Sequence, residues 1–213
     1  MTAPRREAVV ALYREGVEGL VTVGGRLTGD EWERPCCGEW TARDLAGHVL
    51  VVSGWYHQWL DRALGGHAAA PFVASELAVR NAAALGDLPD SSGPVRLQRF
   101  ATSAWDYAGR VAEHWEVPYG FPYGRVPAGV HFGAAASEWN VHAWDLSTLT
   151  PGRHVPTDPA LLYELLGTAL AAGRTSLLPS RLSVGLARRS ARRVAGKVTD
   201  PWSALLERTG RSP

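Results

Sequence analysis

Apolar residues recur at intervals of three and four along most of the chain, which is the spacing of one face of an α-helix. The first run, residues 4–27, places Val9, Leu12, Val17 and Leu20 on one face and ends near two adjacent glycines. No stretch shows the alternation of apolar and polar residues that marks a strand. Further helical patterns cover residues 41–64, 71–86, 92–115, 130–148 and 157–173. We therefore expect an all-α protein in which four principal helices form a bundle.

Two segments rich in turn-forming residues separate these helices. Residues 27–40 include Pro35, which cannot continue a helix, and residues 117–127 hold three prolines and two glycines. We expect both segments to be long irregular loops. Thr41 is followed three residues later by Asp44, a capping-box pattern that predicts the start of the second principal helix.

We expect two parts in this chain, a helical bundle over residues 1–150 and a short, basic helical extension over residues 151–213 that packs on the bundle. The charge is divided unevenly between them. The total of 22 basic and 21 acidic residues is nearly balanced, but from residue 174 onward nine basic residues accompany only Asp200 and Glu207. Such a basic segment is typical either of a solvated helix face or of a site for phosphate or nucleic acid. Because it lacks the interleaved aromatic residues of a base-stacking surface, we expect no nucleic-acid partner.

Cysteine use and hydropathy favour a cytoplasmic location. The two cysteines, Cys36 and Cys37, are sequence neighbours and cannot close a structural loop, which suggests a reducing compartment. Acidic residues interrupt the apolar pattern of the N-terminus, unlike the apolar core of a signal peptide. No stretch approaches the roughly 18 apolar residues of a membrane span. We expect a cytoplasmic protein with no membrane partner, either a monomer or a homodimer.

The segment SEWNVHAWDL carries the strongest chemical signal. On a helix, Glu138 and His142 emerge from one face about 6 Å apart, which suits two ligands of a divalent metal ion. His48, on the inward face of the second principal helix, is the candidate third ligand, and three protein ligands leave a position open for water or substrate. Asp145 is placed to accept a hydrogen bond from His142 and fix its tautomer. The same spacing is also typical of an exposed ion pair or of a histidine in the core.

Other candidate residues have less specific patterns. His131, seven residues before Glu138, could face the site, but its place near a helix start favours an exposed histidine. The adjacent thiols have no basic neighbour except Arg34 and are not expected to act as nucleophiles. Trp40 and Trp139 lie close in sequence to the candidate ligands, where they belong either to the bundle core or to the apolar wall of a pocket.

Three segments together resemble a known family. Residues 32–48 read WERPCCGEWTARDLAGH, residues 138–146 read EWNVHAWDL, and residues 200–213 read DPWSALLERTGRSP. The first two are similar to the signatures of the mycothiol-dependent maleylpyruvate isomerase-like branch of the DinB superfamily. The third is similar to the closing motif of the short members. The resemblance implies a DinB-like four-helix bundle.

The resemblance also implies a metal ion and a thiol co-substrate. A divalent ion, usually zinc and in some members nickel or another metal, would be held at the positions of His48, Glu138 and His142. The low-molecular-weight thiol of the family is mycothiol, the thiol of actinobacteria. The metal would activate it as a thiolate for attack on an electrophilic small molecule, in a transferase or isomerase reaction.

The C-terminal part departs from the pattern of the isomerases themselves. Those enzymes carry a larger C-terminal domain that contributes to the active site, whereas only a short extension follows the fourth bundle helix here. Arg188 and Arg192 are candidates to bind carboxylates of the thiol or substrate in place of that domain.

Two other functions fit the same metal site. One is a thiol-independent hydrolase, lyase or tailoring enzyme of secondary metabolism, and the other is a non-catalytic protein that binds metal or ligand.

Overall fold

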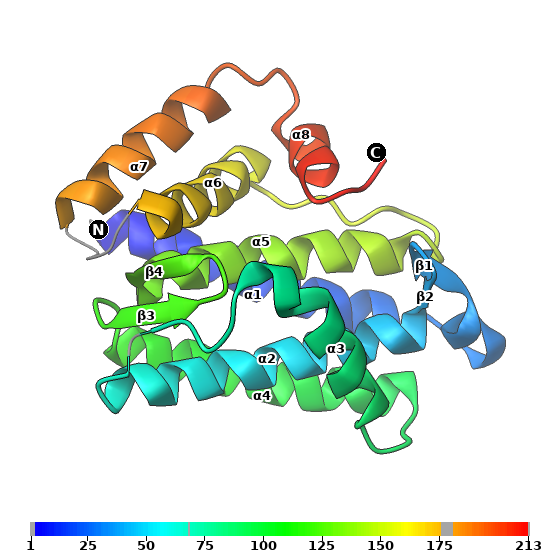
Figure 1. The fold of residues 1–213 in the computed structure, drawn as a ribbon. Helices are drawn as coiled ribbons and strands as arrows, with labels where there is room; N and C mark the ends of the chain where they lie inside the picture. The colour runs from blue at the N-terminus through cyan, green and yellow to red at the C-terminus, as the bar shows by residue number, and fades with distance from the viewer. Residues whose placement is uncertain (1–2, 68, 176–180, 213) are drawn as a thin grey trace.

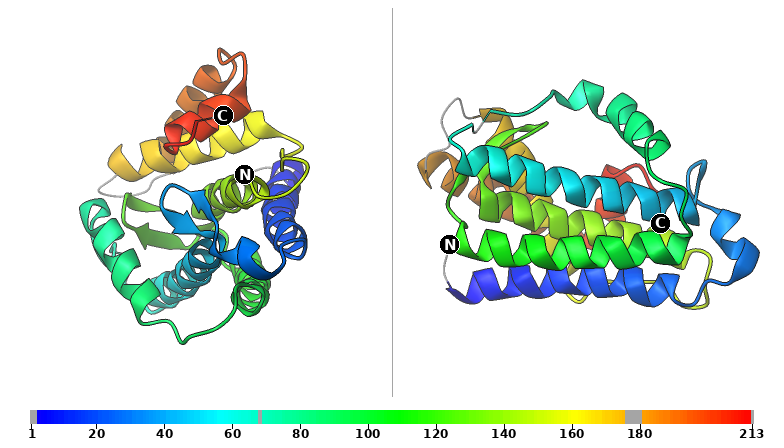
Figure 2. Two further views of the ribbon diagram at one scale, coloured as in Figure 1. Left: turned by 90° about the vertical axis from the view of Figure 1, so that its right-hand side faces the viewer. Right: turned by 90° about the horizontal axis from the view of Figure 1, so that it is seen from below.

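Four long helices lie side by side and form the bundle (Figure 1). The computed structural model describes residues 3–67, 69–175 and 181–212, without the side chains of residues 3, 4, 174, 175 and 181–183. The view from below shows the four helices running alongside one another (Figure 2). They are α1 (Ala3–Gly24), α2 (Ala42–Leu64), α4 (Gly93–Glu113) and α5 (Ala128–Ser147). The predicted all-α class with a four-helix bundle is confirmed.

Helix α2 begins where the capping-box pattern predicts. The Thr41 hydroxyl accepts a hydrogen bond from the backbone N–H of Asp44 at 3.1 Å, and the Asp44 carboxylate accepts one from the N–H of Thr41 at the same distance. Both bonds satisfy backbone donors that have no partner within the helix. This cap fixes the start of the helix segment that carries His48.

Helices α1 and α5 approach each other closely at Gly16. Nearby, Tyr13 of α1 stacks on Phe132 of α5, with ring centroids 4.1 Å apart. A Cβ atom on Gly16 would lie 2.7 Å from Cβ of Trp139, which is well inside the normal separation of packed carbon atoms. The missing side chain therefore sets the distance between α1 and the helix that bears two of the predicted ligands.

Two short β-hairpins occupy the segments expected to be irregular. β1 (Pro35–Cys37) pairs with β2 (Trp40–Thr41), and β3 (Pro118–Phe121) pairs with β4 (Gly124–Pro127), both antiparallel. The expectation of irregular loops was wrong here, because strands of two to four residues are too short to show an alternating pattern. Gly124 begins β4 with a φ of +133°, which glycine adopts without strain.

Further helices cover two sides of the bundle. Helix α3 packs on α2, α6 packs on α5, and α7 and α8 pack on α6. Within the described ranges, no helix is both long enough and apolar enough to cross a membrane. The remaining elements are α3 (Leu77–Gly86), α6 (Pro159–Thr175), α7 (Arg181–Ala195), α8 (Pro201–Arg208) and two 3-10 turns (Gly29–Glu33 and Ala74–Glu76).

Replacing Gly16 with alanine should destabilise the fold. The added methyl group has to displace Trp139 or the backbone of Asn140, and overpacking of this kind costs about 1–3 kcal/mol. Gly109→Ala is the matched control, because Gly109 is exposed within α4 and nothing lies within 4 Å of the added Cβ. There, helix propensity should increase stability by up to about 1 kcal/mol. Urea unfolding measures both free energies, and effects of the same sign would contradict the close approach of α1 and α5.

Candidate metal centre

Two helices bring the three predicted ligands together. His48 comes from α2, and Glu138 and His142 come from successive turns of α5. Oε1 of Glu138 lies 3.5 Å from Nε2 of His48 and 3.4 Å from Nε2 of His142. One ligand atom from each residue lies within 4.8 Å of the other two. Two imidazoles and a carboxylate at this spacing are the donors that zinc and several other divalent ions accept.

The outer nitrogen of each imidazole has its own partner. Nδ1 of His48 lies 2.8 Å from Oδ1 of Asn81 on α3, and Nδ1 of His142 lies 2.8 Å from Oδ2 of Asp145. Because both oxygens are acceptors, each Nδ1 carries a proton, and each ring, when it is neutral, presents the lone pair of Nε2 toward Glu138. Two lone pairs and a carboxylate oxygen repel one another unless a cation lies between them. The arrangement therefore fits a bound metal ion.

Burial and neighbouring charges set the protonation of this cluster. Burial lowers the pKa of His48. Burial raises the pKa of Glu138, but its interactions with His142 and His48 outweigh that effect and hold the pKa well below its usual range. Burial also opposes a charge on His142, yet Asp145 and Glu138 raise its pKa above the ordinary value. A proton on His142 can thus supply the positive charge in the metal-free protein, and metal binding would release it.

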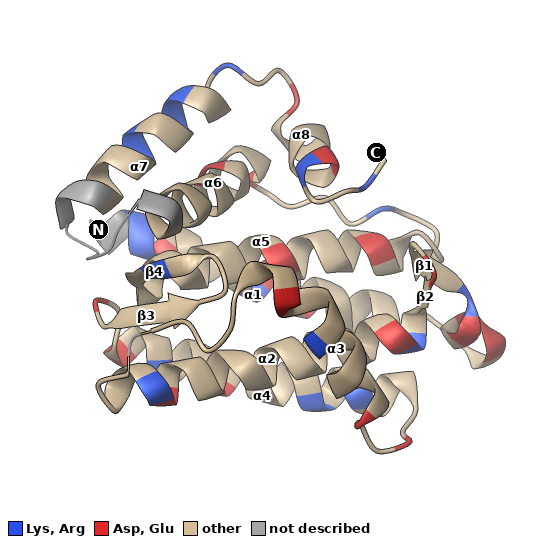
Figure 3. Cartoon of the chain, in the orientation of Figure 1, with Lys and Arg blue, Asp and Glu red and all other residues tan. Residues whose placement is uncertain are grey.

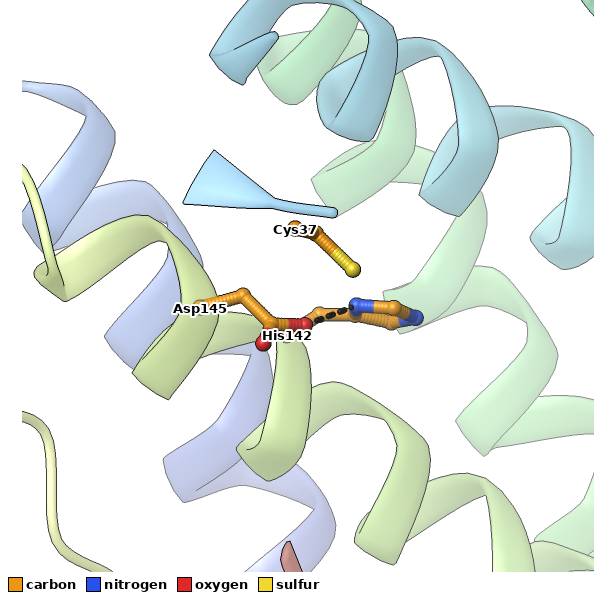
Figure 4. Close-up of side chains that lie close together, drawn as sticks. All are labelled: Cys37, His142 and Asp145. Carbon is orange, nitrogen blue, oxygen red and sulfur yellow. Dashed lines mark hydrogen bonds and ion pairs between the residues drawn. The ribbon is translucent and has the colours of Figure 1, made fainter. Parts of the chain in front are cut away.

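The C-terminal segment reaches the outer side of the site through Arg211. This residue donates to both carboxylate oxygens of Asp145, from Nε at 3.1 Å and from Nη2 at 2.7 Å. Nη2 of Arg211 also lies 3.4 Å from Sγ of Cys37. Figure 4 shows Cys37, His142 and Asp145 gathered at this point, with Asp145 bound to the His142 ring. Arg211 therefore acts on His142 through the carboxylate that orients it.

Asn81 and Arg211 were not predicted from the sequence. Asn81 lies on α3, whose apolar pattern predicts a helix but not the direction of its polar side chains. Arg211 lies in the closing segment, 66 residues after its partner Asp145. Its place within the DPWSALLERTGRSP motif was the one available signal.

Two cavities meet at two of the three ligands, His48 and Glu138. A polar cavity of about 650 Å³ is lined by residues that include Cys37, Asp145 and Arg211. An apolar cavity of about 830 Å³ lies under α3, where Trp55 and Trp59 contribute to its wall. A larger groove of about 1060 Å³ runs along α1 and contains none of the three ligands. The residues that line both of the first two cavities are Trp40, His48, Glu138 and Leu166. An open metal position would thus be reached from a polar and from an apolar side.

The other predicted binding residues differ in their distance from the site. Trp40 borders it, with its ring centroid 4.8 Å from that of His48. Trp139 is completely buried in the core and lines neither cavity. As the residue after Glu138, it points about 100° away around the helix. Arg188 and Arg192 also line neither cavity, because α6 separates α7 from α5 (Figure 3).

His131 is buried, contrary to the exposed position expected near a helix start. The side chain is almost inaccessible, and burial lowers its pKa to about 3. The physical reason is the unpredicted hairpin of β3 and β4, which covers the first turns of α5. Tyr119 of β3 lies against His131, with ring centroids 4.4 Å apart.

The three ligands should be required for binding of one divalent ion per chain. His142→Ala removes a donor and should abolish tight zinc binding, whereas Asp145→Asn loses only the support of His142 and should weaken binding about 10–100-fold. His67→Ala, at an exposed position after α2, is the control and should bind zinc as the wild type does. Competition with a chromophoric chelator measures these affinities. The assignment fails if His142→Ala and His67→Ala bind zinc equally well.

Comparison with known proteins identifies the family of this chain. The family described as mycothiol maleylpyruvate isomerase N-terminal domain matches residues 13–147. The matched region includes His48, Glu138 and His142. No curated protein and no solved structure matches the chain. The match covers more than half of the sequence, and the chain therefore belongs to the mycothiol maleylpyruvate isomerase N-terminal domain family, within the DinB-like superfamily.

Proposed function

We propose that this protein is a divalent-metal enzyme that adds a low-molecular-weight thiol, mycothiol, to an electrophilic small molecule. The product is either the thiol conjugate or, after elimination of the thiol, an isomer of the electrophile. The observation that carries the proposal is the convergence of His48, Glu138 and His142 where a polar and an apolar cavity meet. A metal held by three protein ligands retains a position for a further ligand. Membership of a mycothiol-related family supports the choice of thiol.

Zinc is the metal that we propose for this site. Two histidines and one glutamate form a ligand set typical of catalytic zinc, although nickel and other divalent ions accept the same donors. When bound, such an ion lowers the pKa of a ligating thiol and so provides a thiolate at neutral pH. The role of Asn81 and Asp145 is to hold the Nδ1 protons of the two histidines, which keeps both Nε2 atoms available.

The thiol has to come from solution, because the protein's own thiols are poorly suited to attack. Burial, reinforced by the nearby charge of Asp145, raises the pKa of Cys36 to about 12 and that of Cys37 to about 11. Both are therefore protonated near neutral pH, and the thiol form is a weak nucleophile. We assign mycothiol to the polar cavity, where Thr209 and Arg211 offer hydrogen-bonding groups.

Consumption of an electrophile should require both the metal and mycothiol. The zinc-loaded protein is incubated with maleylpyruvate and with aromatic enones, and mass spectrometry follows conjugates and isomers. His48→Ala should lower kcat/KM by about 100-fold or more, because a metal ligand is lost. Turnover that persists without any thiol would overturn the proposal and indicate a hydrolase or lyase.

Serine at both cysteine positions should leave most of the thiol-dependent activity intact. The Cys36→Ser, Cys37→Ser variant keeps side chains of similar size and removes the only thiols of the chain. The expected kcat is within a factor of about three of the wild-type value, because the exchange of sulfur for oxygen nearly preserves the side-chain shape and the proposed reaction uses neither thiol. Zinc content is measured in parallel. A loss of activity at full zinc content would show that a protein thiol takes part in the reaction.

A further inference from the structure

The cavity under α3 is built mainly from aromatic and aliphatic side chains and ends at the proposed metal ligands. Trp55 and Trp59 of α2 stack on each other with ring centroids 6.1 Å apart, and both line the cavity. The volume of about 830 Å³ is within the range of small-molecule sites. Flat apolar ring faces of this kind suit an aromatic guest.

Most polar side chains of this wall already have partners. His48 and Asn81 are hydrogen-bonded to each other, Asp44 caps α2, and Glu138 faces the two histidines. A ligand in the cavity would therefore have to compete with the existing partners of these side chains. His131 differs from them because one of its ring nitrogens has no partner among the described residues.

His131 is a buried polar residue in the cavity wall, and only one of its ring nitrogens has a hydrogen-bond partner among the described residues. It is 3% exposed and lies among the rings of Tyr56, Tyr119 and Phe121, with centroids 4.6, 4.4 and 5.2 Å away. Its Nδ1 lies 3.2 Å from the hydroxyl of Tyr107, whereas Nε2 has no hydrogen-bond partner in the described part of the chain. His131 lines the cavity and Tyr107 does not, so the Nε2 edge, opposite the edge that contacts Tyr107, is the one available to the cavity. A ligand or a water molecule there can complete the hydrogen bonding of Nε2.

The hydroxyl of Tyr107 sets the tautomer of this ring. A phenol is a stronger acid than a neutral imidazole N–H, and an imidazole nitrogen is a stronger base than a phenol oxygen. The favoured bond therefore runs from the Tyr107 hydroxyl to Nδ1 of His131. The low pKa of about 3 keeps the ring neutral, so its single proton is on Nε2. His131 consequently offers an N–H donor to the cavity.

We propose that the apolar cavity binds the aromatic part of the electrophile and that Nε2–H of His131 donates a hydrogen bond to an acceptor on it. The inference rests on the proposed function, because it names the substrate class of that same site. His131 precedes Glu138 by two helical turns, a rise of about 10 Å along α5. The substrate class is therefore an aromatic electrophile that carries an acceptor, such as a carbonyl oxygen, at the end of the ring opposite its reactive carbon.

Two unreactive probes of the same shape test the hydrogen bond without any catalysis. 4′-Methylacetophenone carries a carbonyl acceptor, and p-cymene has an isopropyl group in its place. In ligand-observed NMR titrations, His131→Phe should weaken binding of the ketone about three- to tenfold and leave the affinity for p-cymene unchanged or higher. Tyr107→Phe frees the tautomer of His131 and should weaken ketone binding alone. Trp55→Ala should weaken both probes alike, because it removes an aromatic contact rather than a donor.

The outcomes separate this inference from the proposed function. Neither probe has a conjugated alkene or a leaving group that would react with a thiol, so their binding needs no thiol and no turnover. If both probes bind as expected but no electrophile reacts with mycothiol, the proposed thiol addition is wrong, whereas the proposed aromatic binding site is supported. If His131→Phe retains its circular dichroism spectrum and zinc content yet changes both affinities equally, or neither, the hydrogen bond from His131 is overturned.

Discussion

Two imidazole nitrogens face a single carboxylate oxygen between α2 and α5, and the surrounding structure is arranged to hold them there. Oε1 of Glu138 lies within 3.5 Å of Nε2 on both His48 and His142. Such a cluster is repulsive without a positive charge, so its persistence depends on groups that prevent the rings from turning away. Asn81 from α3 and Asp145 from α5 provide that restraint by binding the opposite nitrogens. Helix α3, which lies outside the bundle, is thereby connected directly to the proposed metal site.

The same restraint extends to the C-terminal segment through an ion pair. Asp145 is 1% exposed and accepts two hydrogen bonds from Arg211. A buried carboxylate is costly unless it is paired, and removal of one partner is more damaging than loss of the whole pair. Arg211, in the segment after α8, is therefore one of the groups that hold Asp145, and through it His142, in place at the proposed site.

Local sequence patterns predicted the parts of the site that depend on local geometry. The spacing of Glu138 and His142 follows from helix periodicity, and the start of α2 follows from the pairing of Thr41 with Asp44. The same periodicity shows why Trp139 points into the core, since it follows Glu138 directly. Contacts between segments that are far apart in the sequence do not produce a local sequence pattern of this kind.

The contacts that were missed all involve segments far apart in the sequence. Arg211 meets Asp145 only because α6 and α8 pack back onto α5. His131 is buried only because a hairpin with strands of four residues covers the start of its helix. Neither the hairpin nor the return of the C-terminal segment has a periodic pattern that could be recognised beforehand.

The meeting of two unlike cavities constrains which molecules can react. Maleylpyruvate carries two carboxylates, and burial of a carboxylate without a positively charged partner is strongly unfavourable. Among the described residues that line the apolar cavity there is no arginine or lysine, while Asp44 and Glu138 add negative charge. Away from the proposed metal ion, a small dianion would therefore find no positively charged side chain among the described residues of this cavity. The lining of the apolar cavity thus suits a neutral, ring-containing electrophile, which agrees with the aromatic substrate class proposed above.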